Sequence, residues 1–434
     1  MSARHRAGPA MERCVVALAM ATLAWLAGIA GAAAQAQDRG DVRAFTLKQA
    51  FDAAWQRQPE SRSAAARQQA ADAQAAVARS WTAEPAALEL STKTDRLSGN
   101  HGAREYEAGV AVPLWLPGER RGAQALAQAE LDAVASRVDA ARWRLAAAVR
   151  EAWWTLQRAA LDGVLARARL ANAQQLAADV ARRVKAGDLS RADQHQADAA
   201  VAAAQAALAE AQAAHVLARQ TLRSHTGAAI PEPAPSADEP PRSEPPPDAA
   251  RAGGEPRSDH PALRDLGARA DVARRTRELA SLQTRANPEL TISTTRDRGA
   301  FGDAYAQSLT FGVRIPFGSD DRRQVRLANA AAELTEAEAQ FEIEQTRIAT
   351  EIAAAEARAD AARAMADAAE RRAALAVETR RLIEKSFRLG ETDLPARLRV
   401  ELEAFEAERQ RERSRIELAQ AISQWRQALG LLPE

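Results

Sequence analysis

The feature that most constrains the fold of this chain is an internal duplication. The segment Gly-Val-Ala-Val-Pro-Leu at 109–114 reads like Gly-Val-Arg-Ile-Pro-Phe at 312–317, which lies 203 residues further along the chain. Gly187 and Gly390 keep this offset, and glycines 227 and 430 keep it again. A repeat of this kind indicates a duplicated structural unit. We therefore expect two copies of one unit.

A seven-residue apolar repeat runs through the middle of each copy, with bulky residues at both ends and alanines in between. Such a repeat predicts coiled-coil packing, and the central alanines let neighbouring helices approach closely. An alanine-rich chain supplies alanines at any spacing, but it does not explain why the bulky ends match. The positions are Leu131, Val138, Leu145, Ala152, Ala159, Ala166, Ala173 and Val180 in the first copy, and Leu334, Phe341, Ile348, Ala355, Ala362, Ala369, Ala376 and Ile383 in the second.

The N-terminus reads as a secretory signal peptide over residues 1–36. Three arginines precede an apolar run from Val15 to Ala33, and small residues follow it. This order predicts cleavage after Ala34 or Ala36. A membrane anchor is the alternative, although the run is short and interrupted by glycines.

Composition excludes several classes of function. The only cysteine, Cys14, lies in the signal, so the mature chain has neither a disulfide nor a thiolate metal site. None of the six histidines is paired at ligand spacing, and we expect no metal and no cofactor. Cleavage removes three arginines and one glutamate from 59 basic and 58 acidic residues, leaving 56 and 57, so nucleic acid is not an expected partner. No catalytic motif is present, so we expect no enzyme.

Two segments, 85–113 and 288–316, change from helical to alternating periodicity around turn-rich loops, which predicts two β-hairpins. In the last strand of the second hairpin, one face carries apolar or aromatic residues except at Gln307. They are Tyr305, Leu309, Phe311, Val313 and Ile315. The other face carries Ala306, Ser308, Thr310, Gly312 and Arg314. This pattern is typical of a membrane-barrel strand, and also of a half-buried strand in a soluble sheet. Four strands cannot close a barrel alone, so several subunits would have to contribute.

Aromatic residues flank the two hairpins as an interfacial belt would require, although each could equally be a core residue. They are Trp81, Trp115 and Phe317 on the helix side and Phe301 and Tyr305 near the second loop.

After each hairpin the chain runs without proline, over 118–186 and 320–389, which corresponds to roughly 100 Å of helix. Turns follow at Gly187 and Gly390, and a returning helix of about 36 residues, roughly 54 Å long, ends near the glycine at 227 or 430. Shorter helices, over 47–80 with a break at Pro59 and over 260–286, would stack end to end on the returning ones. Between the copies, which span 37–227 and 259–434, residues 228–258 are a proline-rich linker, extended or disordered, that crosses the outside.

Together these features resemble the outer membrane factor (TolC) family. The most specific pieces are Gly-Val-x-Val/Ile-Pro at 109–113 and 312–316, and the helix-tip sequence Phe-Arg-Leu-Gly-Glu-Thr at 387–392. The resemblance implies a mainly α fold with a small β part. Each subunit would have long coiled-coil hairpins and four transmembrane strands, and a trimer would form a twelve-stranded barrel and an α-helical periplasmic tunnel.

The resemblance also implies a function, a passive exit duct in the outer membrane that extends into the periplasm. Its partners would be two further copies of this chain, a periplasmic adaptor (membrane fusion protein), an inner-membrane pump of the RND type and outer-membrane lipid. The segment 286–296 is most similar to the CzcC-like heavy-metal efflux branch, which implies heavy-metal cations as substrates, with drugs as the alternative. The competing hypothesis is the adaptor itself, which predicts one long hairpin and a larger β-rich region.

The resemblance places adaptor-binding residues at the two helix tips, where as turn formers they would also cap the helices. They are Lys185, Gly187, Asp188, Leu189, Arg388, Leu389, Gly390, Glu391 and Thr392. Candidate tunnel-mouth charges follow the second tip. The family has acidic residues there, whereas this chain mixes both signs, with Asp393, Arg397, Arg399 and Glu401.

Overall fold

The computed structural model describes residues 45–227, 243–248, 258–318 and 320–434. The chain divides into two units, Met1–Thr46 and Leu47–Glu434, and of the first only Phe45 and Thr46 are described. The fold below is therefore that of the second unit. The predicted signal peptide, its cleavage site and most of the predicted linker lie outside the described residues.

Seven helices are described in this unit, and they follow the predicted order. The first copy holds α2 (Leu47–Arg57), α3 (Pro59–Ala78), α4 (Glu119–Ala186) and α5 (Arg191–Thr226), and the second holds α6 (Pro261–Leu282), α7 (Asp320–Arg388) and α8 (Leu394–Ala428). The long and returning helices are confirmed within a few residues. The chain breaks at Gln58 because proline disfavours helical dihedrals in the residue before it. None of the described helices combines the length and apolarity that a membrane-crossing helix needs.

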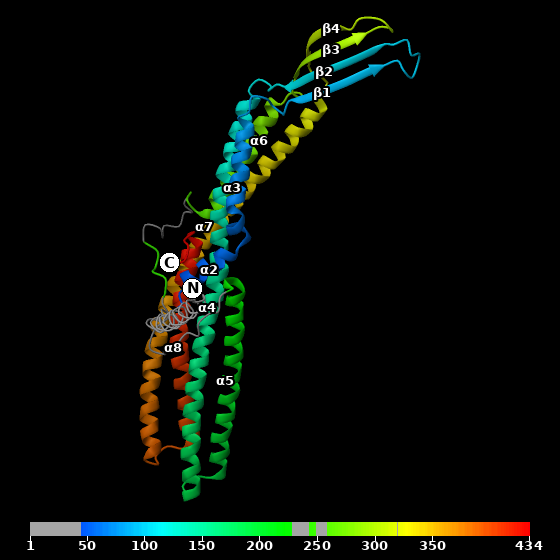
Figure 1. Ribbon diagram of the computed structural model, residues 1–434. Coiled ribbons are helices and arrows are strands. Elements are labelled where there is room, and N and C mark those ends of the chain that lie inside the picture. The colour runs from blue at the N-terminus through cyan, green and yellow to red at the C-terminus, as the bar shows by residue number, and fades with distance from the viewer. Residues whose placement is uncertain (1–44, 228–242, 249–257, 319) are drawn as a thin grey trace, which may run out of the picture. The chain divides into compact units, whose positions relative to one another are not determined.

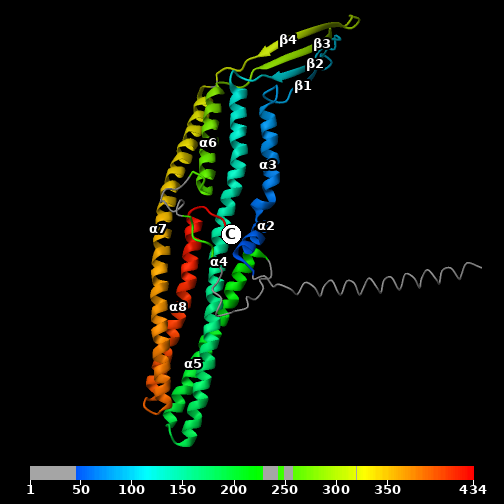
Figure 2. The same ribbon diagram turned by 90° about the vertical axis from the view of Figure 1, so that its left-hand side faces the viewer.

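The helices form a layer that is built around α4. Toward the tips, α8 lies between α7 and α4, and α5 covers the other side of α4; toward the sheet, α6 takes the place of α8 and α3 that of α5 (Figure 2). The helix α7 therefore borders one side of the layer along its length, and α5 borders the other side near the tips.

The shorter helices meet the returning ones end to end at two equivalent glycines. Gly227 follows α5 with φ 67°, and a Cβ there would lie 1.9 Å from Nη1 of Arg57. Gly430 follows α8 with φ 79°, and a Cβ there would lie 2.7 Å from Cδ of Pro261. Both joints favour glycine for the left-handed backbone, and Gly430 also for the close approach of Pro261. The predicted stacking is confirmed.

The seven-residue repeat lies on the inward faces of α4 and α7. All of its positions are buried or half-buried, from Leu131 to Val180 and from Leu334 to Ile383. Val180 and Ile348 are almost completely covered, and small alanines fill the turns between the bulky residues. The predicted coiled-coil seam is thus confirmed in both copies.

The four strands, β1 (Ala87–Thr94), β2 (Arg104–Pro113), β3 (Glu289–Arg298) and β4 (Ala306–Arg314), form one antiparallel sheet in sequence order at the end of the helices opposite the tips (Figure 1). In one row of the register, Leu88, Val110, Ile292 and Phe311 lie opposite one another. Because side chains alternate, one face is apolar across all four strands. Tyr305 and Ile315, which the pattern includes in the last strand, directly flank it.

A buried carboxylate fixes the sheet to the helices. Glu119, in the first turn of α4, accepts hydrogen bonds from the Leu116 backbone N–H (2.9 Å), Gln283 Nε2 (2.8 Å) and Asn287 Nδ2 (2.9 Å). It is 2% exposed. One side chain therefore ties the start of α4 to the segment between α6 and β3.

Candidate functional site

The first helix tip is a tight turn between α4 and α5. Gly187 has φ 89°, its N–H donates to the Val184 carbonyl (3.1 Å), and the Asp188 N–H donates to the Arg183 carbonyl (2.9 Å). This pattern closes the carbonyls at the end of α4. The side chains of Ser190 and Asp193 then cap α5 reciprocally. Hydrogen bonds from the Ser190 hydroxyl and N–H lower the pKa of Asp193.

The second tip, between α7 and α8, reaches a similar shape with other residues. Gly390 has φ 78°, and the Glu391 N–H donates to the Ser386 carbonyl (3.0 Å). The Ser386 and Thr392 hydroxyls are 2.6 Å apart. Asp393 caps α8 by accepting from the Ala396 N–H at 3.0 Å. The tip is therefore held by its own backbone and side-chain hydrogen bonds.

Most of the residues predicted to bind an adaptor are exposed on these tips. Leu189 and Thr392 are half-buried, and the others are exposed: Lys185, Gly187, Asp188, Arg388, Leu389, Gly390 and Glu391. A Cβ at either glycine would meet nothing within 4 Å. The glycines are thus required by their positive φ and not by crowding, and the surface in front of them is open.

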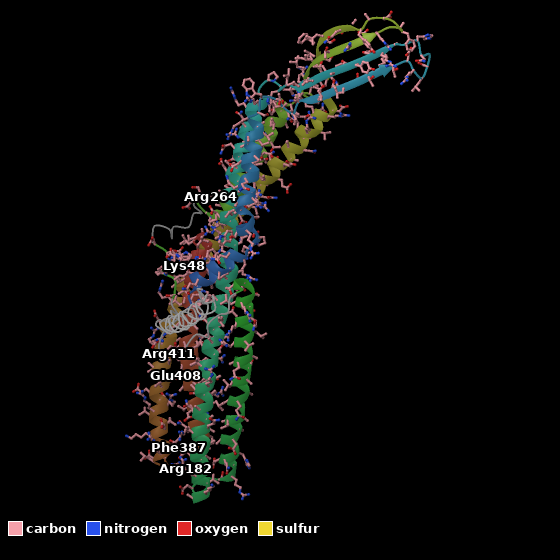
Figure 3. The ribbon with its side chains drawn as sticks, viewed as in Figure 1. Lys48, Arg182, Arg264, Phe387, Glu408 and Arg411 are labelled. Atoms are coloured by element: carbon pink, nitrogen blue, oxygen red, sulfur yellow. The ribbon has the colours of Figure 1, made fainter. Side chains whose placement is uncertain are left out.

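The two tips are joined by a small core that the sequence analysis did not identify. Leu176, Val180 and Ala197 of the first copy pack with Phe387 and Leu394 of the second. Phe387 is 1% exposed and lies near the tip end of the helices (Figure 3).

Two arginines complete this small core. Arg183 and Arg397 each lie 4.7 Å from the centre of the Phe387 ring. Because Phe387 follows the repeat position Ile383 by four residues, it occupies the second seam position of a heptad. That spacing is the signal that could have identified it.

Two of the four candidate tunnel-mouth charges are paired with each other. Arg397 Nε lies 3.1 Å from Glu401 Oε1, so these two charges offset each other. Asp393 is committed to the cap of α8, while Arg399 is exposed. The four residues therefore comprise one ion pair, one capping carboxylate and one exposed arginine.

The described part of the linker differs from the prediction. Residues 243–248 do not merely cross the outside, because Glu244 and Pro247 are buried. Glu244 makes two hydrogen bonds to Arg150 of α4 and accepts a third from the Ser423 hydroxyl of α8. The negative charge of Glu244 explains the difference, because α4 and α8 present buried arginines, and Arg426 Nε also lies 3.5 Å from it. The neighbouring linker residues lie outside the described ones.

The predicted aromatic belt is divided between exposed and structural roles. Trp81 and Phe317 are 91% and 94% exposed beside the helix end of the sheet. Trp115 is half-buried, and its Nε1 donates to the Ser80 carbonyl at 3.2 Å. Phe301 is exposed at the second loop, and Tyr305 is half-buried there. Within the described ranges no three potential metal ligands lie together.

Comparison with known proteins agrees with this geometry. Residues 50–228 match a family model described as outer membrane efflux protein. The fold is that of the outer membrane factors. VceC of Vibrio cholerae aligns with a TM-score of 0.70 at 20% identity, over 89% of this chain and 97% of that one. CmeC of Campylobacter jejuni aligns with a TM-score of 0.69 at 14% identity, over 88% of this chain and 85% of that one.

The open state of the MtrE channel of Neisseria gonorrhoeae gives a TM-score of 0.67 at 18% identity, over 89% of each chain. Among curated proteins, none matches this sequence. The channel folds confirm the predicted mainly α fold with a small β part, whereas the trimeric barrel and the heavy-metal branch stay predictions.

Proposed function

We propose that this protein is the exit duct of a tripartite efflux system, a passive channel formed by three copies of the chain. It lies in the outer membrane and extends into the periplasm. The observation that carries the proposal is the sheet: four strands present one apolar and one polar face, at the end of roughly 100 Å of helix. A lipid-facing and a water-facing side on the same strands are what a membrane barrel requires.

The open edges of the molecule support assembly with further copies. In the described sheet, β1 and β4 are edge strands, each with one unpaired side, and four strands are too few to close a barrel. The bordering helices have exposed apolar side chains as well. They are Val216 and Leu217 on α5, and Val325, Ile343, Met365, Leu375 and Leu382 on α7. In the proposed trimer, each open edge is covered by the neighbouring copy.

The polar face of the sheet supports a water-filled interior that favours cations. It carries five acidic residues and two basic ones: Glu89, Glu105, Glu107, Glu289 and Asp297, with Lys93 and Arg314. Three copies would multiply this acidic excess around one pore, and rings of charge set selectivity in channels. This balance is consistent with the heavy-metal cations that the sequence resemblance suggests, delivered by an RND-type pump.

The tips are the proposed contact with the periplasmic adaptor. They are exposed, they lie opposite the sheet, and the space in front of the two glycines is open. They are also not alike, because the core residue Leu189 corresponds to Thr392 in the second copy, and the 66% exposed Leu389 corresponds to Ala186 in the first. We therefore propose two kinds of adaptor contact in each subunit. We propose that opening of the helical end separates the two tips and disrupts the packing of Phe387.

The proposal is tested by the location and stoichiometry of the full-length protein expressed in a Gram-negative cell. Membranes are separated by density, the protein is extracted with detergent, and its mass is measured by light scattering corrected for detergent. We expect the outer-membrane fraction and a mass of three chains. Recovery in the soluble periplasmic fraction, or a strict monomer in detergent, would contradict the duct.

A further inference from the structure

The apolar face of the sheet ends in three arginines beside the hairpin loops. Arg104 of β2 lies opposite Arg298 of β3, and Arg296 lies opposite Tyr106. Because side chains alternate along a strand, these residues share a face with Val110 and Ile292. The arginines therefore continue the apolar face at the end farthest from the helices.

Two of the arginines, Arg296 and Arg298, lie over aromatic rings. The guanidinium carbons of Arg296 and Arg298 lie 4.9 and 5.2 Å from the centre of the Tyr305 ring. Tyr305 in turn lies 6.5 Å from Tyr106, and Arg298 Nε donates to the Gly102 carbonyl at 3.1 Å. Stacked guanidinium groups keep most of their N–H donors directed outward. These contacts fix the positions of the Arg296 and Arg298 side chains on the surface.

No carboxylate of the described residues lies within ion-pair distance of these three arginines. The acidic residues next to them in the same strands, Glu105 and Asp297, alternate to the opposite face, and Glu105 pairs there with Lys93 at 3.6 Å. Three positive charges thus border an apolar surface without internal compensation. Placing a guanidinium on the lipid-facing side costs little free energy at the edge of the bilayer and several times more at its centre. The arginines are therefore tolerated at the edge of the apolar face, and a counter-charge there would stabilise them.

We propose that Arg104, Arg296 and Arg298 bind the phosphate groups of a phosphorylated lipid headgroup whose acyl chains lie on the apolar face below. This inference rests on the proposed duct, which puts the loop end of the sheet at the outer surface of the outer membrane. The planar fork of arginine matches phosphate oxygens. The adjacent side chains of Val110, Ile292 and Leu309 provide the acyl contact that free phosphate lacks.

The test uses native mass spectrometry of the detergent-extracted assembly mixed with diphosphorylated lipid A or with its dephosphorylated form. We expect the wild type to retain the phosphorylated lipid preferentially. Each arginine near a charged surface contributes about a fivefold preference, so the combined Arg104→Gln, Arg296→Gln and Arg298→Gln variant should lose on the order of a hundredfold. The control is Lys93→Gln, at the same height on the opposite face, which should retain the lipid as the wild type does.

A second variant guards against misfolding. Replacing the three arginines by lysine keeps the charge but removes the fork, and we expect a partial loss with trimers intact. Equal retention of both lipids by a trimeric wild type would overturn the inference and leave the duct standing. Displacement of the lipid by excess inorganic phosphate would overturn it too, since the site would then be one for free phosphate. Absence of trimers in the same spectra would overturn the duct, and the inference with it.

Discussion

Glu244 of the connecting segment is paired with Arg150 of α4 at 2.7 Å from Nη2 and 3.1 Å from Nε, and both side chains are 3% exposed. Arg150 also donates to the Leu431 carbonyl at 2.9 Å. Arg426 of α8 donates to the Pro245 carbonyl at 3.1 Å. One carboxylate thus links the segment between the copies to a helix of each copy and, through Arg150, to the C-terminal end.

Removal of this carboxylate should be costly, because Arg150 would lose its buried counter-charge and Arg426 would keep only the exposed Glu434 at 2.8 Å. For Glu244→Ala we expect the free energy of unfolding to fall by about 3–5 kcal/mol. The measurement is denaturant unfolding of the detergent-solubilised protein. Asp248→Asn, an exposed acid in the same segment, is the matched control and should change little. Equal stability of the two variants would contradict the linking role of Glu244.

Phe387 should control how firmly the two tips stay together. Phe387→Ala removes a buried ring and its contacts with Arg183 and Arg397, and we expect a local loss of about 3–5 kcal/mol. In planar bilayers the variant should spend more time in a high-conductance state. Leu389→Ala, which alters an exposed side chain of the same tip, is the control. Unchanged gating in Phe387→Ala would argue that this core does not close the duct.

His260 should make the joint between α6 and α8 sensitive to acid. Burial lowers the pKa of His260 below 6.5, and its Nδ1 accepts from the Ala262 N–H, so the native imidazole is neutral. The unfolded chain binds the proton more readily, so stability is complete above pH about 6.5 and is lost as pH falls toward the native pKa. His260→Gln, which can still cap α6, should show a smaller loss of melting temperature on acidification. Parallel curves for the two proteins would refute this role.

At the tip glycine Gly390, added bulk should reduce export without affecting the formation of trimers. Asparagine accepts positive φ better than other residues, so Gly390→Asn should keep trimers while adding bulk to the docking surface. We expect export in cells to fall severalfold, with Gly318→Asn, another open glycine with positive φ but near the sheet, as the control. Loss of trimers in Gly390→Asn would instead make this glycine structural.

The repeat and the periodicities were sufficient to predict most of the architecture. The offset between Gly227 and Gly430 predicted two equivalent joints, and the alternation around Phe311 predicted the apolar face. These features are local or periodic, so they are visible in the sequence. The helix ends were also predictable, because Gly187 and Gly390 take a left-handed conformation that few other residues adopt.

The contacts between distant segments could not be read in the same way. Glu244 lies among prolines in a segment that is typical of linkers. Nothing near it in the sequence indicates that its partner is Arg150, a buried arginine of a distant helix. Phe387 could be placed on a helix seam, but its partners Arg183 and Arg397 come from two other helices. Such pairs depend on which helix faces which, and that is fixed only by the folded layer.

The most direct test of the duct is single-channel recording of the wild-type trimer in a planar bilayer. We predict that each inserted trimer adds one step of equal conductance. In a salt gradient, the reversal potential should show a preference for cations. Neutralising Glu105 and Glu107 of the polar face should weaken that preference, whereas Leu309→Ala on the apolar face should leave it unchanged. A trimer that inserts but conducts no ions under any applied voltage, in the wild type and in Phe387→Ala alike, would contradict the account.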